Sequence, residues 1–492
     1  MRDVIVSINA GQISGRQNAG VEYFLSVPYA APPVGANRFK APQPVEPWTG
    51  VRDAGISGAN APQRTGEVPG LDAESLIGKG WHRGDDYLTL NIWKPEGTCK
   101  DAPVMVFIHG GGFVVGSKDA PVSDGSSFAF NGIICVAINY RMGIDGFMPI
   151  DDVPTNLGLR DQIFALEWVQ SQIHRFGGDP NNVTVFGESA GAMSVANLIA
   201  SPKAEGLFKR AIIQSGHGAM TRSITTAKKL TYKMARLLGV PATAAGFASC
   251  DLDKVLDAVE KISKPIPGVD LRDEHGFEPV FGISRFIPVH GDDILPQPPL
   301  QALQDGRGAQ VQVLIGTNAE EMNLYLVPTG VREKMFGLLA VWLLHRSHPN
   351  ARKTLKAYGL GKRKAGHVLA DAMNDLVFRW PARRFAEEHL GQTHFYEFEW
   401  RSPAFGGELG ACHALELPFV FNTLPTATGP QGLAGAAPPQ ALADHIHGVW
   451  CEFARSGRLP WAEFDKVERK VYRLEAQMVV NEPVMRAAEF LP

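Results

Sequence analysis

The sequence predicts an α/β protein built on a large, mostly parallel, twisted sheet with helices on both faces. Strand-like apolar runs alternate along the chain with segments of helical apolar spacing, an order typical of parallel sheets that are covered on both sides. Two of these strands lead directly into glycine-rich turns, at 110–112 and 187–191. We find no internal repeat and no low-complexity linker, so residues 1–492 are expected to form a single domain.

Each element is predicted from its local pattern. Strands are short runs rich in β-branched and aromatic residues, and helices carry apolar residues three or four positions apart. The chain begins with a short strand and a turn within 1–11. In chain order, the further expected elements are strands at 104–108 and 132–140, a helix at 161–174, a strand at 183–186, a helix at 190–200, strands at 208–216, 311–316 and 394–400, and a helix at 441–455.

Three stretches interrupt this alternation. Residues 57–84 are rich in glycine, proline and polar residues and are expected to form a variable loop. The helix-rich stretches 221–264 and 331–390 are expected to form a lid or the walls of a substrate cleft, because long insertions commonly do so. In the second stretch, the candidate cleft-lining side chains are Phe336, Leu339, Trp342 and Leu343.

Composition and charge exclude several classes of protein. The 492 residues are 45% hydrophobic and 20% charged, which is ordinary for a globular enzyme. A net charge of −3 without a long basic run argues against a nucleic-acid partner. The longest apolar run, 335–344, is too short to span a membrane and is expected to be a buried or cleft-lining helix. With no signal peptide recognised, we expect a cytoplasmic monomer or small homo-oligomer without a membrane partner.

No cofactor or metal is expected from the sequence. The five cysteines are scattered, and none forms a Cys-x-x-Cys pair. The sequence contains no His-Glu-x-x-His string of the kind that binds catalytic zinc. Cys412 lies beside a candidate catalytic histidine, and we expect it to be a small packing residue rather than a reactive thiol.

A serine between two glycines is the strongest chemical signal in the chain. Ser189 stands two positions from both Gly187 and Gly191, after an apolar strand and before a run of small helical residues. A nucleophilic serine at such a turn is exposed on a strained backbone, and the glycines let strand and helix approach closely. The N–H groups that begin the helix point toward charge developing near the serine. The alternative is a chance match to a short string.

A second glycine run lies upstream, where the strand 104–108 leads into His109-Gly110-Gly111-Gly112-Phe113. Consecutive glycines cost conformational entropy, and they suit a backbone that must approach a reacting atom, as in an oxyanion hole. A strand, a His-Gly-Gly-Gly loop and then a serine elbow is the order expected of an α/β-hydrolase. A phosphate loop is excluded because no Gly-Lys-Ser/Thr follows, and His109 has a plausible structural role at the start of the loop.

Ordered motifs along nearly the whole chain resemble those of the type-B carboxylesterases. This branch of the α/β-hydrolases includes the cholinesterases, and the similarity is greatest to bacterial p-nitrobenzyl-esterase-like carboxylesterases. Tyr87 departs from the eukaryotic members, which carry a disulfide-forming cysteine there, and this implies a bacterial-type enzyme. Besides the two glycine motifs, the resemblance rests on 27–39, 48–54, 85–91, 139–143, 156–162 and 176–180.

The resemblance implies a catalytic triad of Ser189, Glu321 and His413. Glu321 lies in Gly-Thr-Asn-Ala-Glu-Glu-Met, which is similar to the family's Gly-x-x-x-Asp-Glu-Gly with Met322 in place of the last glycine. His413 lies in Gly-Ala-Cys-His-Ala-Leu-Glu, which is similar to the family's histidine motif. The alternative for the acid is a solvated loop charge. The implied oxyanion-hole donors are the backbone N–H groups of Gly111, Gly112 and Ala190.

Further candidates surround this set. Phe113, His217 and Met322 are candidate substrate contacts, and simple packing is the alternative for Phe113. Glu188 precedes the serine and either joins a hydrogen-bond network with Ser215 or favours the start of the helix.

Three functions are compatible with these residues. The first is a serine carboxylesterase that hydrolyses small, neutral, fairly apolar esters through an acyl-enzyme on Ser189. The second is another acyl hydrolase that cleaves amides, carbamates or thioesters with the same triad. The third is a catalytically silent binding protein of this fold, although such relatives typically lose the nucleophile or the base, and both are present here.

Overall fold

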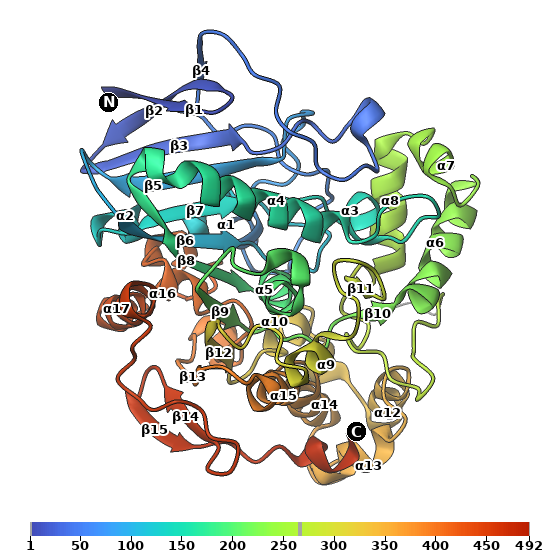
Figure 1. Cartoon of the computed structure of the whole chain (residues 1–492). Coiled ribbons are helices and arrows are strands. Elements are labelled where there is room, and N and C mark those ends of the chain that lie inside the picture. Colours follow the sequence, from blue (N-terminus) through green and yellow to red (C-terminus); the bar gives the residue numbers. More distant parts are fainter. Residues whose placement is uncertain (1, 264–267, 492) are drawn as a thin grey trace.

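In the computed structural model, which describes residues 2–263 and 268–491, one large sheet organises the chain (Figure 1). Within these residues, twelve strands follow one another across the sheet, and β4 pairs with β2 beside them. From one edge to the other, the strands are β1 (Arg2–Ile8), β2 (Gly11–Asn18), β3 (Val21–Pro28), β5 (Thr89–Pro95), β7 (Ile134–Ile138), β6 (Ala102–Ile108), β8 (Gly178–Glu188), β9 (Arg210–Gln214), β12 (Gln312–Asn318), β13 (Thr393–Phe398), β14 (Lys470–Arg473) and β15 (Met478–Asn481), with β4 at Val51–Asp53.

The centre of the sheet is parallel and its two ends are antiparallel. Every neighbouring pair from β7 to β14 is parallel, whereas β1, β2, β3, β5 and β7 pair antiparallel in sequence and β15 pairs antiparallel with β14. The predicted α/β-hydrolase class, with a mostly parallel sheet, is therefore confirmed. Parallel pairs need long crossover connections, which here contain helices, while two-residue turns join β1 to β2 and β2 to β3.

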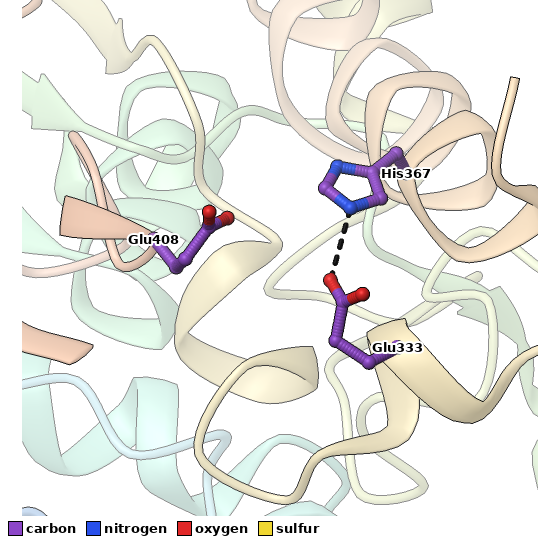
Figure 2. A group of neighbouring side chains, drawn as sticks. All are labelled: Glu333, His367 and Glu408. Atoms are coloured by element: carbon purple, nitrogen blue, oxygen red, sulfur yellow. Dashed lines mark hydrogen bonds and ion pairs between the residues drawn. The ribbon is translucent and has the colours of Figure 1, made fainter. Parts of the chain in front are cut away.

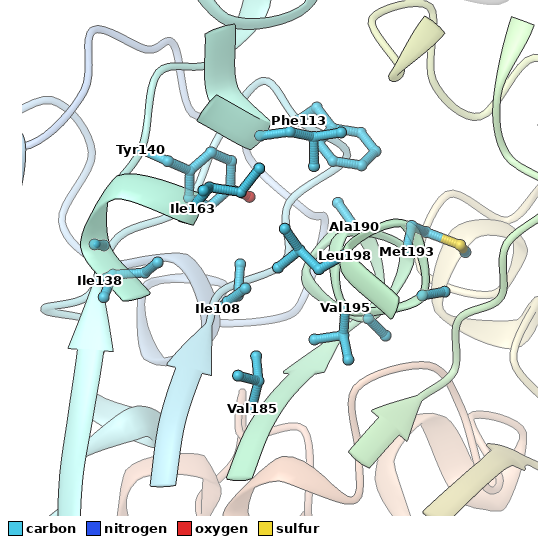
Figure 3. Close-up of a cluster of buried hydrophobic side chains, with 14 of the residues drawn as sticks. Ile108, Phe113, Ile138, Tyr140, Ile163, Val185, Ala190, Met193, Val195 and Leu198 are labelled. Atoms are coloured by element: carbon cyan, nitrogen blue, oxygen red, sulfur yellow. The ribbon is translucent and has the colours of Figure 1, made fainter. Parts of the chain in front are cut away.

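The parallel strands are apolar on both faces because helices cover both. Along β6, Val104, Val106 and Ile108 face one core, and Met105 and Phe107 face the other. Alternate side chains of a strand point to opposite faces, so each face receives a continuous apolar layer. The first core lies under α4 (Leu157–Gln172) and α5 (Ala190–Ala200), as Figure 3 shows, and the second lies under α2 (Ser126–Phe130), α16 (Leu417–Val420) and α17 (Gln440–Ser456).

The two stretches predicted as helical insertions are helical, and the 57–84 loop carries one short helix, α1 (Glu74–Ile77). Residue 264, the predicted end of the first insertion, lies outside the described residues. Across the residues that the structure describes, no helix is both long and apolar enough to cross a membrane. The helices of the insertions are α6 (Ile224–Leu238), α7 (Ala244–Ala248), α8 (Leu252–Ser263), α11 (Val331–Lys334), α12 (Gly337–His345), α13 (Ala351–Ala357), α14 (Ala365–Asn374) and α15 (Trp380–Glu388).

Shorter elements complete the fold. The helices α3, α9 and α10 are each four to six residues long, and β10 and β11 form a separate two-stranded parallel sheet. Their bounds are Gly143–Phe147 (α3), Pro299–Gln304 (α9), Asn323–Leu326 (α10), Arg222–Ser223 (β10) and Val289–His290 (β11).

The start of α5 lies directly against the end of β6. A Cβ atom added to Gly191 would lie 1.9 Å from the carbonyl oxygen of Ile108, and one added to Gly187 would lie 2.6 Å from the carbonyl carbon of Gly191. Atoms cannot approach so closely, so only glycine at both positions lets the helix begin this near the strand. This contact fixes where Ser189 lies relative to the loop that follows β6.

We expect Gly191→Ala to destabilise the protein by about 3 kcal/mol, because its methyl group would displace backbone in a close-packed core. Gly448→Ala is the matched control, since Gly448 lies within α17 with nothing near its Cβ position. Alanine there is expected to stabilise the protein by up to about 1 kcal/mol through helix propensity. Urea unfolding followed by circular dichroism measures both, and similar midpoints for the two variants would contradict the close contact.

Candidate active site

Ser189 occupies a strained turn between β8 and α5. Its φ of 55° and ψ of −123° lie outside the regions that non-glycine residues normally adopt. Its backbone N–H donates to the carbonyl of Gln214 at 3.0 Å, and its own carbonyl accepts from Met193 at 2.8 Å. The strain is therefore held by the neighbouring strand on one side and by the helix on the other. The predicted elbow is present with the geometry that exposes a serine side chain.

The His-Gly-Gly-Gly loop lies against this turn. A Cβ atom on Gly110 would lie 3.1 Å from Cβ of Ser189. Gly111 and Gly112 have φ of 102° and 62°, which favour glycine. The loop is closed by hydrogen bonds from the N–H groups of Val114 and Val115 to the carbonyl of Gly111. The N–H groups of Gly111 and Gly112 take no part in these two bonds.

His413 and Glu321 form a short, fully buried contact. Nδ1 of His413 lies 2.6 Å from Oε2 of Glu321, whose other carboxylate oxygen accepts the N–H of Asn318 at 2.7 Å. The N–H of His413 also donates to the carbonyl of Glu321 at 3.2 Å. Glu321 follows β12 and His413 precedes α16, so the contact joins two loops at the carboxyl ends of the sheet strands. Of the two glutamates in the motif, Glu320 instead pairs with Arg401.

A second carboxylate faces the other nitrogen of His413. Nε2 lies 3.1 Å from Oε1 of Glu188, although the atoms are not aligned for a hydrogen bond, and Ser189 shares no hydrogen bond with His413 in this arrangement. Burial by itself lowers the pKa of His413, but Glu188 and Glu321 outweigh it and raise that pKa to about 9. Burial, with the charges of Glu416 and Glu321, raises the pKa of Glu188 to about 8 despite the nearby imidazole.

Glu416 completes a buried polar network that the sequence did not reveal. Its carboxylate accepts from Nδ2 of Asn318 at 2.6 Å and from Nε2 of Gln214 at 3.0 Å. Asn318 also donates to the carbonyl of Cys412, beside the histidine. Burial and the charge of Glu321 raise the pKa of Glu416. In the sequence, Glu416 is marked only by its place three residues after His413. That position alone does not indicate that its side chain turns inward.

Two aromatic rings hold the imidazole of His413 in place. The rings of Phe378 and Tyr325 lie 4.9 and 5.6 Å from it, both tilted. Neither was among the sequence candidates, because Phe378 is distant in sequence and Tyr325 lies four residues after Glu321 without a recognisable motif. Their packing limits rotation of the ring and excludes water from one side of it.

An apolar pocket of about 310 Å³ opens onto Ser189 and His413. This volume is at the small end of ligand pockets, and the walls are mostly aliphatic. One wall comes from the predicted variable loop and α1, and the others come from the segments around 114–122, 283, 324 and 414–433. The apolar lining side chains include Val68, Leu71, Leu76, Ile77, Val114, Val115, Val122, Ile283, Leu324, Leu417 and Leu433.

Several predicted contacts lie away from this pocket. Phe113 is packed against Phe147 with ring centroids 4.5 Å apart, as part of the core in Figure 3. His217 is buried, with Nε2 2.7 Å from the carbonyl of Val377, and Met322 is buried in the core. These three residues do not line the pocket because their backbone directs them into the interior.

Two further expectations also differ from the structure. The hydroxyl of Ser215 has no hydrogen-bond partner, so it does not form the network with Glu188 that the sequence suggested as one alternative. The helical insertions supply none of the pocket lining, and Phe336, Leu339, Trp342 and Leu343 in particular lie outside it. His109, in contrast, takes a structural position, with its ring stacked on Tyr140 and its carbonyl accepting the tyrosine hydroxyl at 2.9 Å.

A second group of polar side chains has the donor types of a metal site. Among the described residues, Glu333, His367 and Glu408 bring their ligand atoms within 4.8 Å of one another (Figure 2). This set would suit zinc. Both carboxylates are already neutralised, however, because Lys364 lies 2.8 Å from Glu333 and Arg332 pairs with Glu408. A metal ion would have to displace both cations, so we assign no metal function to the group.

The fold and the elbow–loop–histidine arrangement define a serine hydrolase of the α/β-hydrolase class. The profile of the carboxylesterase family matches residues 2–489. The chain is 34% identical to the para-nitrobenzyl esterase of Bacillus subtilis, over 98% of this chain and 97% of that one, and 32% identical to the phenmedipham hydrolase of Pseudarthrobacter oxydans, over 92% and 90%. A solved PNB esterase structure superposes with a TM-score of 0.84 at 30% identity, covering 99% of both chains.

The chain therefore belongs to the carboxylesterase family, and it is a carboxylic ester hydrolase. The sequence resemblance is confirmed at the level of family, fold and reaction class.

We expect Glu188→Gln to lower the pKa of His413 by about 1 unit or more, because an opposite charge at this distance stabilises the imidazolium. The histidine Cε1–H resonance, assigned with a His413→Gln variant, gives the pKa by NMR titration. Glu452→Gln, which changes an exposed glutamate of α17, is the control and should leave the pKa unchanged. An unchanged pKa in Glu188→Gln would mean that Glu188 does not carry its charge beside the ring.

Proposed function

We propose that Ser189 is the nucleophile, His413 the general base and Glu321 the group that orients it. The observation that carries the proposal is the 2.6 Å contact between Glu321 and His413, with His413 and the strained Ser189 turn both lining one apolar pocket. Glu321 fixes the tautomer that carries the proton on Nδ1 and leaves Nε2 free to accept a proton. Hydrogen bonds of this kind are often long or misaligned without substrate and tighten when it binds.

The proposed reaction has two halves. Nε2 of His413 accepts the hydroxyl proton of Ser189 while Oγ attacks the ester carbonyl, and the imidazolium then gives this proton to the departing alcohol. Water next attacks the acyl-enzyme, with His413 again accepting and returning the proton. The negative oxygen of each tetrahedral intermediate would be stabilised by the N–H groups of Gly111, Gly112 and Ala190, and loss of one such donor typically costs about 100- to 1,000-fold in turnover.

Glu188 has a proposed electrostatic part in this cycle. His413 must be neutral to accept a proton, and Glu188 together with Glu321 raises its pKa to about 9. Turnover of the free enzyme is therefore expected to rise with pH through this value. The same charge stabilises the imidazolium that forms in each transition state. Glu188 therefore disfavours the neutral His413 of the free enzyme and favours the charged His413 that forms during the reaction.

The pocket favours neutral, fairly apolar esters of small or moderate size. Its walls are aliphatic, and its volume of about 310 Å³ is at the small end of ligand pockets. Amides, carbamates and thioesters could be cleaved by the same groups, because the chemistry of acyl transfer is shared. A silent binding role is disfavoured, since nucleophile, base and acid are all present and the base and acid are in contact.

We expect Ser189→Ala to lower kcat/KM for p-nitrophenyl butyrate by at least about 10⁴-fold, as for other serine hydrolases that lose the nucleophile. Ser215→Ala is the matched control, because its buried hydroxyl makes no hydrogen bond, and it should keep nearly full activity. Labelling by a fluorophosphonate probe should follow the same pattern. Folded wild-type protein that shows neither turnover nor labelling would reject the assigned nucleophile.

We expect the size of the side chain at Leu76 to set the preferred acyl or alcohol chain length. Leu76 lines the pocket from α1 and is only partly buried, so substitutions there need not disturb the core. Leu76→Ala should shift the optimum of a p-nitrophenyl ester series toward longer chains and Leu76→Trp toward shorter ones, by about tenfold in the kcat/KM ratio per methylene. The same optimum in both variants would place the variable part of the substrate elsewhere.

A further inference from the structure

An exposed apolar surface lies on α12, far in sequence from the elbow. Leu338 is 81% exposed, Phe336 60% and Trp342 48%. Leu338 and Trp342 are four residues apart and share one face of the helix. The sequence predicted a buried or cleft-lining helix here, and instead only Ala340 and Leu344 of α12 are buried, in a small core with α13 and α14. Large apolar side chains exposed together commonly mark an interaction surface.

Positive charge surrounds this helix. From Lys334 to Ala370 the chain contains eight lysine and arginine residues and no aspartate or glutamate, although the whole protein carries a net charge of −3. Arg346 lies over the ring of Trp342 at 5.3 Å. In Figure 1, α12 and the basic helix α13 lie together at the lower right, and the two are in contact. The exposed apolar face and the basic side chains therefore belong to one region of the surface.

Nearby acidic groups neutralise only part of this charge. Glu333 pairs with Lys364 and Asp371 pairs with Arg363, both at the α14 side. Asp273 and Glu274 lie in the loop whose Phe277 packs against His348, in the segment between α12 and α13.

Around α13, several cations remain unneutralised. Arg352, Lys353, Lys356 and Lys362 are exposed and form no ion pair with a carboxylate among the described residues.

We propose that this surface binds the face of an anionic phospholipid bilayer. Leucine, phenylalanine and tryptophan side chains on a surface helix enter the boundary between headgroups and acyl chains, and lysine and arginine beside them attract anionic headgroups. At nine residues, α12 would lie in this boundary rather than cross the bilayer. The interaction is peripheral, and it departs from the expectation, drawn from the sequence, of no membrane partner.

The surface is connected to the catalytic pocket through a short segment. Phe281 packs against the small core that contains α12, and Ile283, two residues later, lines the pocket. The hydroxyl of Ser284 then donates to the carbonyl of Gly112 at 2.7 Å. A bilayer bound at α12 would thus lie near a pocket suited to apolar esters, which dissolve in lipid. This second step rests on the proposed function, whereas the binding itself does not.

Co-sedimentation of the full chain with vesicles tests the binding without using activity. We expect binding to 1:1 phosphatidylglycerol–phosphatidylcholine vesicles, weaker binding to pure phosphatidylcholine, and loss of the difference at high salt. Leu338→Glu/Trp342→Glu and Lys353→Glu/Lys356→Glu should each weaken binding to the anionic vesicles about tenfold or more. The matched control is Val467→Glu/Val484→Glu, which places two acids on equally exposed valines (83% and 84%) elsewhere and should bind as the wild type does.

Further measurements test whether each variant is folded and separate lipid binding from self-association. Unchanged thermal unfolding and unchanged turnover of soluble p-nitrophenyl acetate show that each variant is folded. Absence of binding by wild type, or equal binding by all variants, would overturn the proposal. A wild-type dimer in sedimentation velocity that Leu338→Glu converts to monomer would assign the surface to self-association and overturn it as well. Lipid binding that persists in Ser189→Ala would stand even if the proposed hydrolysis failed.

Discussion

The contact between the start of α5 and the end of β6 is the constraint on which the active site depends. Because Gly191 has no side chain, the helix begins against the carbonyl of Ile108, and the strained Ser189 turn is placed beside the loop that leaves the same strand. Two glycine motifs that are far apart in the chain thereby become two sides of one site. A larger residue at this contact would push the helix away from the strand and would move the Ser189 turn relative to the glycine loop.

Around this rigid centre, the protein buries more charge than catalysis by a triad requires. Glu188, Glu321 and Glu416 share a dry environment with one imidazole, and unpaired buried charges are costly. The structure reduces that cost with amide donors from Asn318 and Gln214 to Glu416, and burial raises the pKa of Glu188 to about 8. The same network influences the pKa of His413. The free energy of unfolding and the basicity of this histidine therefore depend on the same buried groups.

The segments outside the sheet have different structural roles, and their composition does not reveal which role each one has. The loop at 57–84 supplies a wall of the pocket at Ser189, while α12, α13 and α14 of the second insertion pack around a small core of their own. As a result, α12 presents apolar side chains to solvent within a basic region.

The sequence by itself determined the fold class, the succession of central strands and helices along the chain, and the elbow and glycine loop, because these follow from local periodicity and from short motifs with fixed backbone demands. It also indicated Glu321 and His413, which the structure brings into contact. Only the tertiary structure decided that Phe113, His217 and Met322 turn into the core, that Glu188 faces the histidine, that Glu416 turns inward to Asn318 and Gln214, and that α12 is exposed. Side-chain direction and burial depend on which distant segment packs alongside, and no local pattern in the chain specifies that neighbour.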